Sequence, residues 1–394
     1  MHVGYLIQRS ARYFRRRTAV VLGDGRLTFE EVDGRANRLC SALRDLGIGK
    51  GARVAILLHN CKEFVEADFG VSKGGFVKLL VSPRYTPEEI RFVLEDSGAE
   101  CIIFGQEFEG TIDSIRGNLP SLKHLVRVGE ERGEWLHYEA LLAEASPAEP
   151  ESDVAEEDLY EIKYTSGTTG RPKGAMFTHR AKIANVLNIF TDRIPISPED
   201  KMLHVGSLAY ASGFYMLPHF LRGAANVLLK RFDPEEIFET IQNQRITTLS
   251  IVPTMLYMML AHPRVRRYDY SSLKAIYYGG APMSTEKLKE DIAVFGNVFY
   301  QTYGLIEAPM SAHLPISEHK ANGSERELKR MGSVGREITN AEIRIVDELG
   351  KEVKSGAVGQ LIIRAPHAMA GYWNNLAETR RTLCDGWIFT GDVG

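Results

Sequence analysis

The sequence predicts an α/β protein with two layered lobes, each built on a mostly parallel sheet, and a small β-rich third region. Helix-like and strand-like patterns alternate from about residue 28 to 104 and again from 159 to about 303, which is typical of parallel sheets covered by helices. From Gly332 the pattern changes to short strand-like runs around turns. An acidic segment, 143–158, separates the two alternating stretches and contains no basic residue. The expected division is a first lobe with its linker over 1–158, a second lobe over 159–331, and a β-rich subdomain resembling a distorted barrel over 332–394.

The N-terminal segment predicts a helix followed by a hairpin. Leu6, Ile7 and Phe14 form an apolar stripe among arginines, and "TAVVLGDGRLTF" follows with an Asp-Gly turn. The arginines that precede the first acid, Asp24, are also a property of transit peptides. Direct continuation into the hairpin favours the first helix of the fold.

The rest of the first lobe alternates helices with buried strands. The third helix has the clearest start, with Thr86 as N-cap and Pro87 at the first helical position. The expected helices are 30–47, 61–75 and 86–98, and the expected strands are 53–58, 76–81 and 99–105.

The second alternating stretch begins with a strand, 159–164, that runs directly into a glycine-rich loop. A helix over 178–190 follows, so we expect the order strand, loop, helix. Further strands are expected at 225–230, 246–252 and 273–280, further helices at 234–244 and 284–296, and short antiparallel strands within 341–353 and 359–366.

Composition favours an ordinary globular protein with a small-molecule partner. The 394 residues are 44% hydrophobic and 25% charged, with a net charge of −3 and no dominant basic block, which argues against a nucleic-acid partner. No apolar run is long enough for a transmembrane segment, and none near the start resembles a secretory signal, so a cytoplasmic location is expected. The four cysteines lie far apart, which argues against a disulfide framework or zinc site. The oligomeric state is left open.

The loop "YTSGTTGRPKG", Tyr164 to Gly174, predicts a phosphate site. Hydroxyl side chains and the backbone N–H groups of a glycine-rich loop can donate to an anion, and Lys173 adds a mobile positive charge. The Walker pattern requires Ser or Thr after the lysine, whereas Gly174 stands there. The loop is therefore a different kind of phosphate loop.

This loop resembles the signature of the adenylate-forming family, which includes acyl-CoA synthetases, luciferases and peptide-synthetase adenylation domains. Three further blocks resemble family segments in the expected order: "YYGGAPMS" from Tyr277, "YQTYGLIEAP" from Tyr300, and "GQLIIRAPHAMAGYWN" followed by "DGWIFTGDVG". The resemblance covers nearly the whole chain. It implies attack of a carboxylate on the α-phosphate of ATP, release of pyrophosphate, and transfer of the acyl group to the thiol of CoA, with Mg²⁺ and protein donors neutralising the phosphates.

The resemblance also implies roles for particular residues. Lys173 and Glu307 are the expected catalytic residues, and Glu307 would hold Mg²⁺ together with the Thr165 hydroxyl. Asp392 would accept the ribose hydroxyls. The expected phosphate contacts are Thr165, Ser166, Gly167, Thr168, Thr169, Gly170 and Lys173, and the expected adenine contacts are Gly280, Ala281, Pro282, Gln301, Thr302 and Tyr303.

Two departures from the family pattern affect the expectation. The family usually reads Y-G-x-T-E, whereas Ile306 stands at the threonine position, which we expect to slow adenylation or shift substrate preference. The chain also stops at Gly394, before the hinge and the C-terminal domain that supplies the adenylation lysine and part of the thiol tunnel. We therefore expect the chain as given to be poorly active.

The expected substrate is a fatty or otherwise apolar carboxylic acid. Tyr210 stands where amino-acid-activating relatives keep an aspartate for the substrate amine, and burying an unpaired ammonium would be costly. Tyr210, Phe214, Gly279 and Gly304 are the expected acyl-pocket residues, although the segment around Phe214 could equally be a core helix. The alternatives are an aryl-acid CoA ligase with a short flat pocket and a non-catalytic acyl- or nucleotide-binding module.

Overall fold

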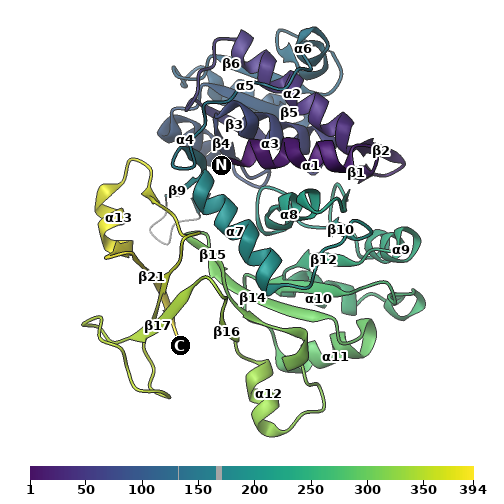
Figure 1. Ribbon diagram of the computed structural model, residues 1–394, viewed down its shortest axis with the longest axis vertical. Coiled ribbons are helices and arrows are strands. Elements are labelled where there is room, and N and C mark those ends of the chain that lie inside the picture. The colour runs from purple at the N-terminus through teal and green to yellow at the C-terminus, as the bar shows by residue number, and fades with distance from the viewer. Residues whose placement is uncertain (132, 166–170) are drawn as a thin grey trace.

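The computed structural model describes residues 1–131, 133–165 and 171–394, arranged as two large sheets with helices around them and a small third sheet (Figure 1). The two lobes and the small C-terminal sheet confirm the predicted fold class. One large sheet has nine strands and is parallel through its centre. In spatial order its strands are β16 (Arg336–Glu337), β15 (Ala308–Leu314), β14 (Phe299–Leu305), β13 (Ala275–Gly279), β12 (Thr248–Ile251), β10 (Lys201–His204), β11 (Ala225–Leu228), β1 (Thr18–Leu22) and β2 (Gly25–Thr28).

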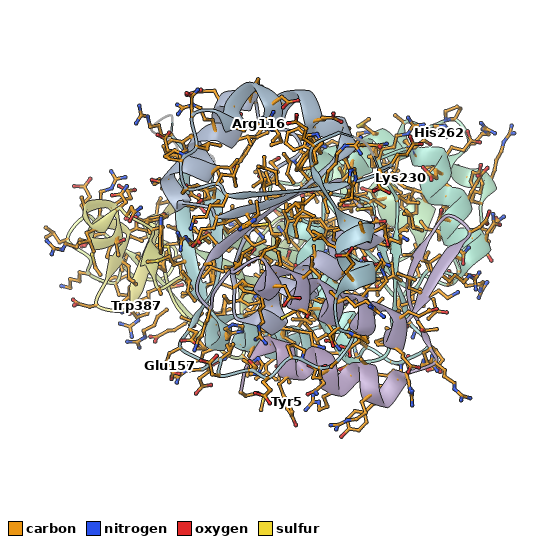
Figure 2. All side chains as sticks on the ribbon, turned by 90° about the horizontal axis from the view of Figure 1, so that it is seen from above. Tyr5, Arg116, Glu157, Lys230, His262 and Trp387 are labelled. Atoms are coloured by element: carbon orange, nitrogen blue, oxygen red, sulfur yellow. The ribbon has the colours of Figure 1, made fainter. Side chains whose placement is uncertain are left out.

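The other large sheet has eight strands, of which five neighbouring pairs are parallel. Its spatial order is β19 (Gly371–Tyr372), β9 (Lys173–Thr178), β8 (Leu159–Thr165), β4 (Val77–Leu80), β3 (Arg53–Leu57), β5 (Cys101–Gly105), β6 (His124–Val128) and β7 (Leu136–His137). The small sheet is antiparallel and consists of β17 (Glu342–Val346), β18 (Gln360–Arg364), β21 (Trp387–Val393) and β20 (Leu383–Cys384). Figure 2 shows Trp387 of the small sheet at one side of the molecule and Lys230 and His262 of the second lobe at the other.

Helices connect the parallel strands. Capping explains where two of them begin, because Thr28 and Thr86 each form a reciprocal capping box with the glutamate three residues on. The helices are α1 (Val3–Phe14), α2 (Phe29–Asp45), α3 (Lys62–Gly74), α4 (Pro87–Ser97), α5 (Glu109–Arg116), α6 (Tyr138–Glu144), α7 (His179–Asp192), α8 (Met216–Leu221), α9 (Pro234–Gln244), α10 (Pro253–Leu260), α11 (Thr285–Phe295), α12 (Glu325–Met331) and α13 (Leu376–Thr382). Among the described residues, no helix combines the length and the hydropathy needed to cross a bilayer.

The expected order of strand, loop and helix after residue 159 is wrong in one respect. A second strand, β9, follows the loop and pairs antiparallel with β8, with Thr165 opposite Lys173. Helix α7 begins only after β9, where Thr178 caps it. The glycine-rich loop therefore connects two paired strands, which fixes the spacing of the residues at its ends.

Strands are exchanged across the lobes. The hairpin β1–β2 lies early in the chain but joins the nine-stranded sheet, where Val20 pairs with Asn226 of β11. Strands β8 and β9 lie after the acidic segment but join the eight-stranded sheet through β4. Each large sheet thus contains strands from both sides of residue 158, where the sequence predicts the boundary between the lobes.

One core cluster joins the lobes. The ring of Phe220 in α8 lies 4.4 Å from that of Phe29 in α2 and 4.7 Å from that of Phe69 in α3, measured between centroids. All three side chains are fully buried. Asn60 adds a polar link, because its side chain donates to the carbonyl of Gly206 at 2.9 Å and accepts from the N–H of Leu208 at 2.9 Å. The lobes therefore share buried contacts beside the ends of their parallel strands.

Candidate active site

The predicted site residues gather where parallel strands of the nine-stranded sheet end. Strands β12, β13 and β14 run parallel and finish at Ile251, Gly279 and Leu305, so their carboxyl ends share one edge. Ligands of open α/β sheets bind at such edges. The end of β8 brings Thr165 from the other sheet, with Lys173 as its strand partner.

Lys173 is the first residue of β9 and is held by an ion pair. Its Nζ lies 2.6 Å from Oε1 of Glu378 in α13, and both side chains are largely buried. The Nζ also lies 5.3 Å from the ring centroid of Tyr372. Hydrogen bonds from Arg381 and then from Lys173 lower the pKa of the Glu378 carboxyl group. Glu378 thus positions the Lys173 ammonium, and a phosphate would have to displace the Glu378 carboxylate to bind it.

Glu307 follows β14 in the turn to β15, and its carboxylate is 8% exposed. Its Oε1 accepts a 2.5 Å hydrogen bond from the hydroxyl of Tyr372. Burial, then the bond to Glu307, raises the pKa of Tyr372, so the hydroxyl stays a donor. No cluster of three or more His, Cys, Asp or Glu suited to a metal occurs within the described residues. One carboxylate fits Mg²⁺ that arrives with phosphate oxygens and water, the usual arrangement for this ion.

The predicted adenine residues lie on two neighbouring strands and the loop after one of them. Gln301 and Thr302 on β14 pair with Tyr278 and Gly279 on β13. The loop after β13 contains Gly280, Ala281 and Pro282, all exposed, and Gly280 has a φ of 79°, which favours glycine.

Tyr303 and Asp392 are in contact. The Tyr303 hydroxyl donates to Oδ2 of Asp392 at 2.7 Å, although 89 positions separate them. Tyr303 is partly buried, and burial followed by the contact with Asp392 raises its pKa. The residues expected at adenine and at ribose therefore lie together.

Gly279 and Gly304 allow close approach of backbone. A Cβ at Gly279 would lie 2.1 Å from the carbonyl oxygen of Thr302, and one at Gly304 would lie 2.4 Å from the backbone nitrogen of Met310. Neither glycine lines the two cavities described below. Their expected role as acyl-pocket residues stays a prediction.

The central part of the phosphate loop lies outside the described residues. This concerns the expected contacts Ser166, Gly167, Thr168, Thr169 and Gly170. The structure describes the loop on either side of this part, up to Thr165 and again from Arg171, with Thr165 opposite Lys173.

A cavity of about 620 Å³ opens between the lobes, next to the ends of β3, β4, β10, β11 and β12. Its exposed lining residues include Arg84, Lys230 and Arg231, whereas Tyr210 and Ile306 are partly buried in its wall. The cavity thus has a basic outer part and an uncharged inner part.

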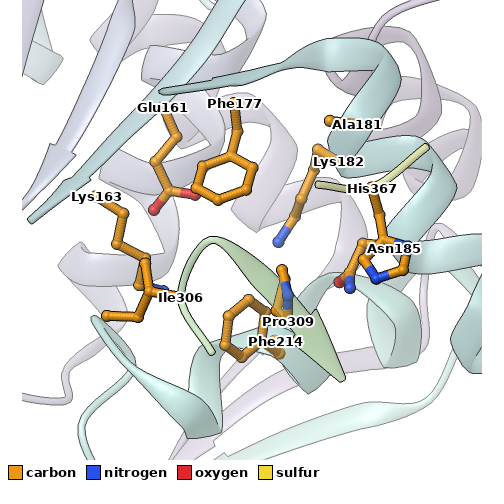
Figure 3. A pocket seen from close by; sticks show the side chains of 10 residues that line it. All are labelled: Glu161, Lys163, Phe177, Ala181, Lys182, Asn185, Phe214, Ile306, Pro309 and His367. Atoms are coloured by element: carbon orange, nitrogen blue, oxygen red, sulfur yellow. The ribbon is translucent and has the colours of Figure 1, made fainter. Parts of the chain in front are cut away.

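A second, small pocket lies on the other side of Ile306, which lines both spaces. Figure 3 shows Phe214 and Ile306 near the charged side chains of Glu161, Lys163 and Lys182. Phe214 and Tyr210 thus line different pockets, and their expected role in an acyl pocket stays a prediction.

Sequence reasoning assigned no role to Tyr372, which contacts both predicted catalytic residues, or to Glu378, which contacts Lys173. Tyr372 lies within the quoted block "GQLIIRAPHAMAGYWN", yet a tyrosine there has no distinctive spacing. Its position follows from the pairing of Tyr372 with Ala175 between β19 and β9, a long-range contact that local pattern does not encode.

Comparison with known proteins identifies the family. The chain matches the family described as "AMP-binding enzyme" over residues 7–373. The chain belongs to this family. It is 32% identical to the medium/long-chain-fatty-acid–CoA ligase FadD8 of Mycobacterium tuberculosis, covering all of this chain and 69% of FadD8. It is 31% identical to the indoleacetate–CoA ligase of Aromatoleum aromaticum, covering all of this chain and 76% of the relative.

The AMP-binding fold extends over the whole chain. A crystal structure of the N-terminal domain of FACL13 from Mycobacterium tuberculosis superposes with a TM-score of 0.90 at 27% identity, covering all of this chain and 96% of that domain. This confirms the predicted correspondence to the large N-terminal part of an adenylate-forming, acyl-CoA-ligase-like protein. The family activates carboxylic acids with ATP and transfers them to CoA.

Proposed function

We propose that this chain is the adenylation part of an AMP-forming acid–CoA ligase that acts on an acid with an apolar body. The observation that carries the proposal is the joining of the two expected catalytic residues by Tyr372, whose ring approaches Lys173 and whose hydroxyl bonds to Glu307. A cation and a carboxylate on either side of one tyrosine suit a metal-bound polyphosphate. Magnesium, when bound, supplies further positive charge to the phosphates.

The protein's own residues would then act in order. Tyr303 packs against adenine and Asp392 accepts from the ribose, which requires Asp392 to exchange its bond from the Tyr303 hydroxyl for ribose hydroxyls. Lys173 leaves Glu378 for a phosphate oxygen. The carboxylate of the acid attacks the α-phosphate, and pyrophosphate leaves.

The 620 Å³ cavity supports the acid–thiol step. Its outer residues Arg84, Lys230 and Arg231 suit the phosphates of CoA, and a thiol arm would extend from them toward Tyr210 and Ile306 in the same cavity. None of the described residues that line the cavity is a carboxylate that could pair with a substrate ammonium, so an amino acid is a poor fit. Both alkyl and aryl acids stay compatible with the cavity, and a fatty acid is the preferred member of this class.

The test measures acid-dependent ATP–pyrophosphate exchange and acyl-CoA by mass spectrometry. The chain is used alone and joined to the C-terminal domain that the family resemblance implies, with octanoate, cinnamate and leucine as acids. We expect octanoate or cinnamate to drive exchange and leucine to be inactive. Exchange driven best by leucine contradicts the acid class, and ATP binding without exchange in either protein favours the non-catalytic module.

A further inference from the structure

The small pocket behind Ile306 and Phe214 carries charges that the proposed reaction does not use. Glu161 and Lys163 lie on β8, with 6% and 5% of their surface exposed, and Lys182 projects from α7. Figure 3 shows the Lys182 ammonium directed into the space between Phe177 and Phe214, and the Glu161 carboxylate beside the Phe177 ring. Lys182 is partly buried. Buried ionised groups are costly unless they are paired, so the two buried charges of Glu161 and Lys163 next to a third charge need a reason.

These charged groups lack close partners among the described residues. Glu161 Oε1 is buried with no hydrogen-bond partner there. Both ammonium groups approach the same aromatic ring: Lys163 Nζ lies 4.3 Å and Lys182 Nζ 5.8 Å from the ring centroid of Phe214. Within the described part of the chain, neither lysine forms an ion pair within 4.0 Å. The donors are therefore available to a ligand.

The pocket has an excess of positive charge. Two ammonium groups face one carboxylate, and the neighbouring Lys78–Asp68 pair, 2.7 Å apart, adds no net charge. The free volume of about 20 Å³ holds one water molecule at most. Ile306 lines both this pocket and the large cavity, so the two spaces adjoin at its side chain.

We propose that this pocket is a subsite for a second carboxylate at the far end of the acid substrate, bound by Lys163 and Lys182. The inference rests on the proposed function and narrows its substrate class to apolar acids with a terminal anionic group, such as medium-length α,ω-dicarboxylic acids. The apolar body of the acid passes Ile306 and Phe214. The far carboxylate occupies the water-sized space between the ammonium groups. Glu161 limits the strength of the site by repelling the same anion.

The experiment uses the chain with acyl-sulfamoyl adenosines, stable mimics of the acyl adenylate, in matched pairs of monoacid and ω-carboxy acid of equal chain length. Calorimetric titration gives the ratio of the two affinities for each length. We expect at least one ω-carboxy member to bind about ten- to a hundredfold tighter than its monoacid partner, the effect of a charge-assisted contact. Lys182→Met and Lys163→Met should each remove most of this preference while leaving monoacid affinity unchanged.

Glu161→Gln is the matched variant, for which we expect the opposite change in affinity for the ω-carboxy probe. It removes the repelling charge, so the ω-carboxy probe should bind more tightly while the monoacid probe does not change. If the cluster has only a structural role, every variant should change the affinities for both probes by the same factor, and that result overturns the subsite. Monoacid binding with equal or weaker ω-carboxy binding at every length overturns the subsite alone, whereas failure of every probe to bind overturns the proposed function as well.

Discussion

The hydroxyl of Tyr372 donates a 2.5 Å hydrogen bond to Oε1 of Glu307, across 65 positions of the chain. Both side chains are buried, with exposures of 4% and 8%. The bond gives a buried carboxylate a neutral donor, and the same tyrosine presents its ring to Lys173 at 5.3 Å. The position of Glu307 therefore depends on a residue in β19, which belongs to the other sheet.

Tyr372→Phe removes this bond and leaves Glu307 buried without it. Because a hydrogen bond to a charged group contributes roughly 1.5–3 kcal/mol, we expect the free energy of unfolding to fall by about that amount. Urea denaturation measures the loss. The control is Tyr13→Phe, at a tyrosine that is 70% exposed, where the change should be within about 0.5 kcal/mol. Equal stability of the two variants contradicts the prediction.

Lys173→Ala should weaken the binding of ATP with Mg²⁺ by about ten- to a hundredfold, since one charge-assisted contact is lost. Glu378→Gln should act in the opposite direction, because Glu378 holds the Lys173 ammonium at 2.6 Å and competes with phosphate for it. Calorimetric titration of ATP with each protein checks both signs. The role of Lys173 is wrong if its removal leaves the affinity unchanged.

Gly279→Ala should destabilise the sheet at the site. A Cβ there meets the Thr302 carbonyl oxygen at 2.1 Å, so β13 and β14 must separate, at a cost of at least about 1–3 kcal/mol. Gly49→Ala is the matched control, since a Cβ at Gly49 has no atom within 4 Å. Thermal unfolding of both variants gives the comparison, and similar melting temperatures would show that this approach of backbones is not tight.

The preference for an ω-carboxy ligand should depend on pH through Lys182. Burial, and then the charge of Lys78, lowers the pKa of Lys182 to about 8. Lys163 and Glu161 face the same space, and the pKa of each is lowered as well, so Glu161 stays ionised. A bound carboxylate favours the ammonium and raises the pKa of Lys182, so binding takes up a proton above pH 8.

The affinity for the ω-carboxy probe should therefore fall as the pH rises through about 8 to 9.5, by up to about tenfold per pH unit, while the monoacid probe shows no such trend. Titrations in two buffers of different ionisation enthalpy report the proton taken up. Lys182→Met should give a flat profile. An unchanged slope in that variant would assign the titration to another group.

The layered fold follows from local pattern because most helices and strands are short and strongly patterned. Thr86 and Pro87 mark the start of α4 by capping chemistry alone. Strand β9 was missed because its six residues, from Lys173 to Thr178, follow a glycine-rich loop and are stabilised by pairing with β8. Pairing of this kind depends on tertiary context and not on propensity.

The candidate site was predictable only where its residues belong to recognisable blocks. Lys173, Glu307, Tyr303 and Asp392 were predicted by resemblance. In the structure Tyr372 contacts the first two, and the last two contact each other. Glu161, by contrast, alternates with apolar residues along β8, as in a strand with one solvated face. In the structure α7 and the turn after β14 cover that face, so the charge is buried by elements distant in sequence.

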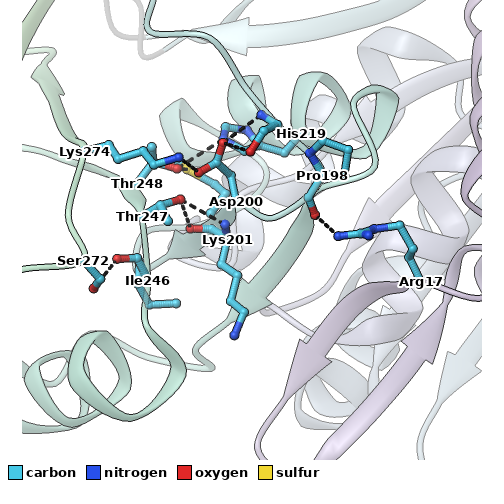
Figure 4. Close-up of polar contacts among 12 residues, drawn as sticks. Arg17, Pro198, Asp200, Lys201, His219, Ile246, Thr247, Thr248, Ser272 and Lys274 are labelled. Carbon is cyan, nitrogen blue, oxygen red and sulfur yellow. Dashed lines mark hydrogen bonds and ion pairs between the residues drawn. The ribbon is translucent and has the colours of Figure 1, made fainter.

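The exchange of strands between the sheets affects how the protein can fold during synthesis. The hairpin β1–β2 leaves the ribosome early, but its parallel partner β11 begins at Ala225, so the hairpin waits for about two hundred further residues. Arg17, just before β1, also donates to the carbonyl of Pro198, a contact seen in Figure 4. An early fragment that ends in the acidic segment therefore exposes an unpaired β1 edge and lacks β8 beside β4. Each large sheet needs strands from both parts of the chain. A nascent chain therefore remains exposed to aggregation or chaperone binding until β11 has emerged.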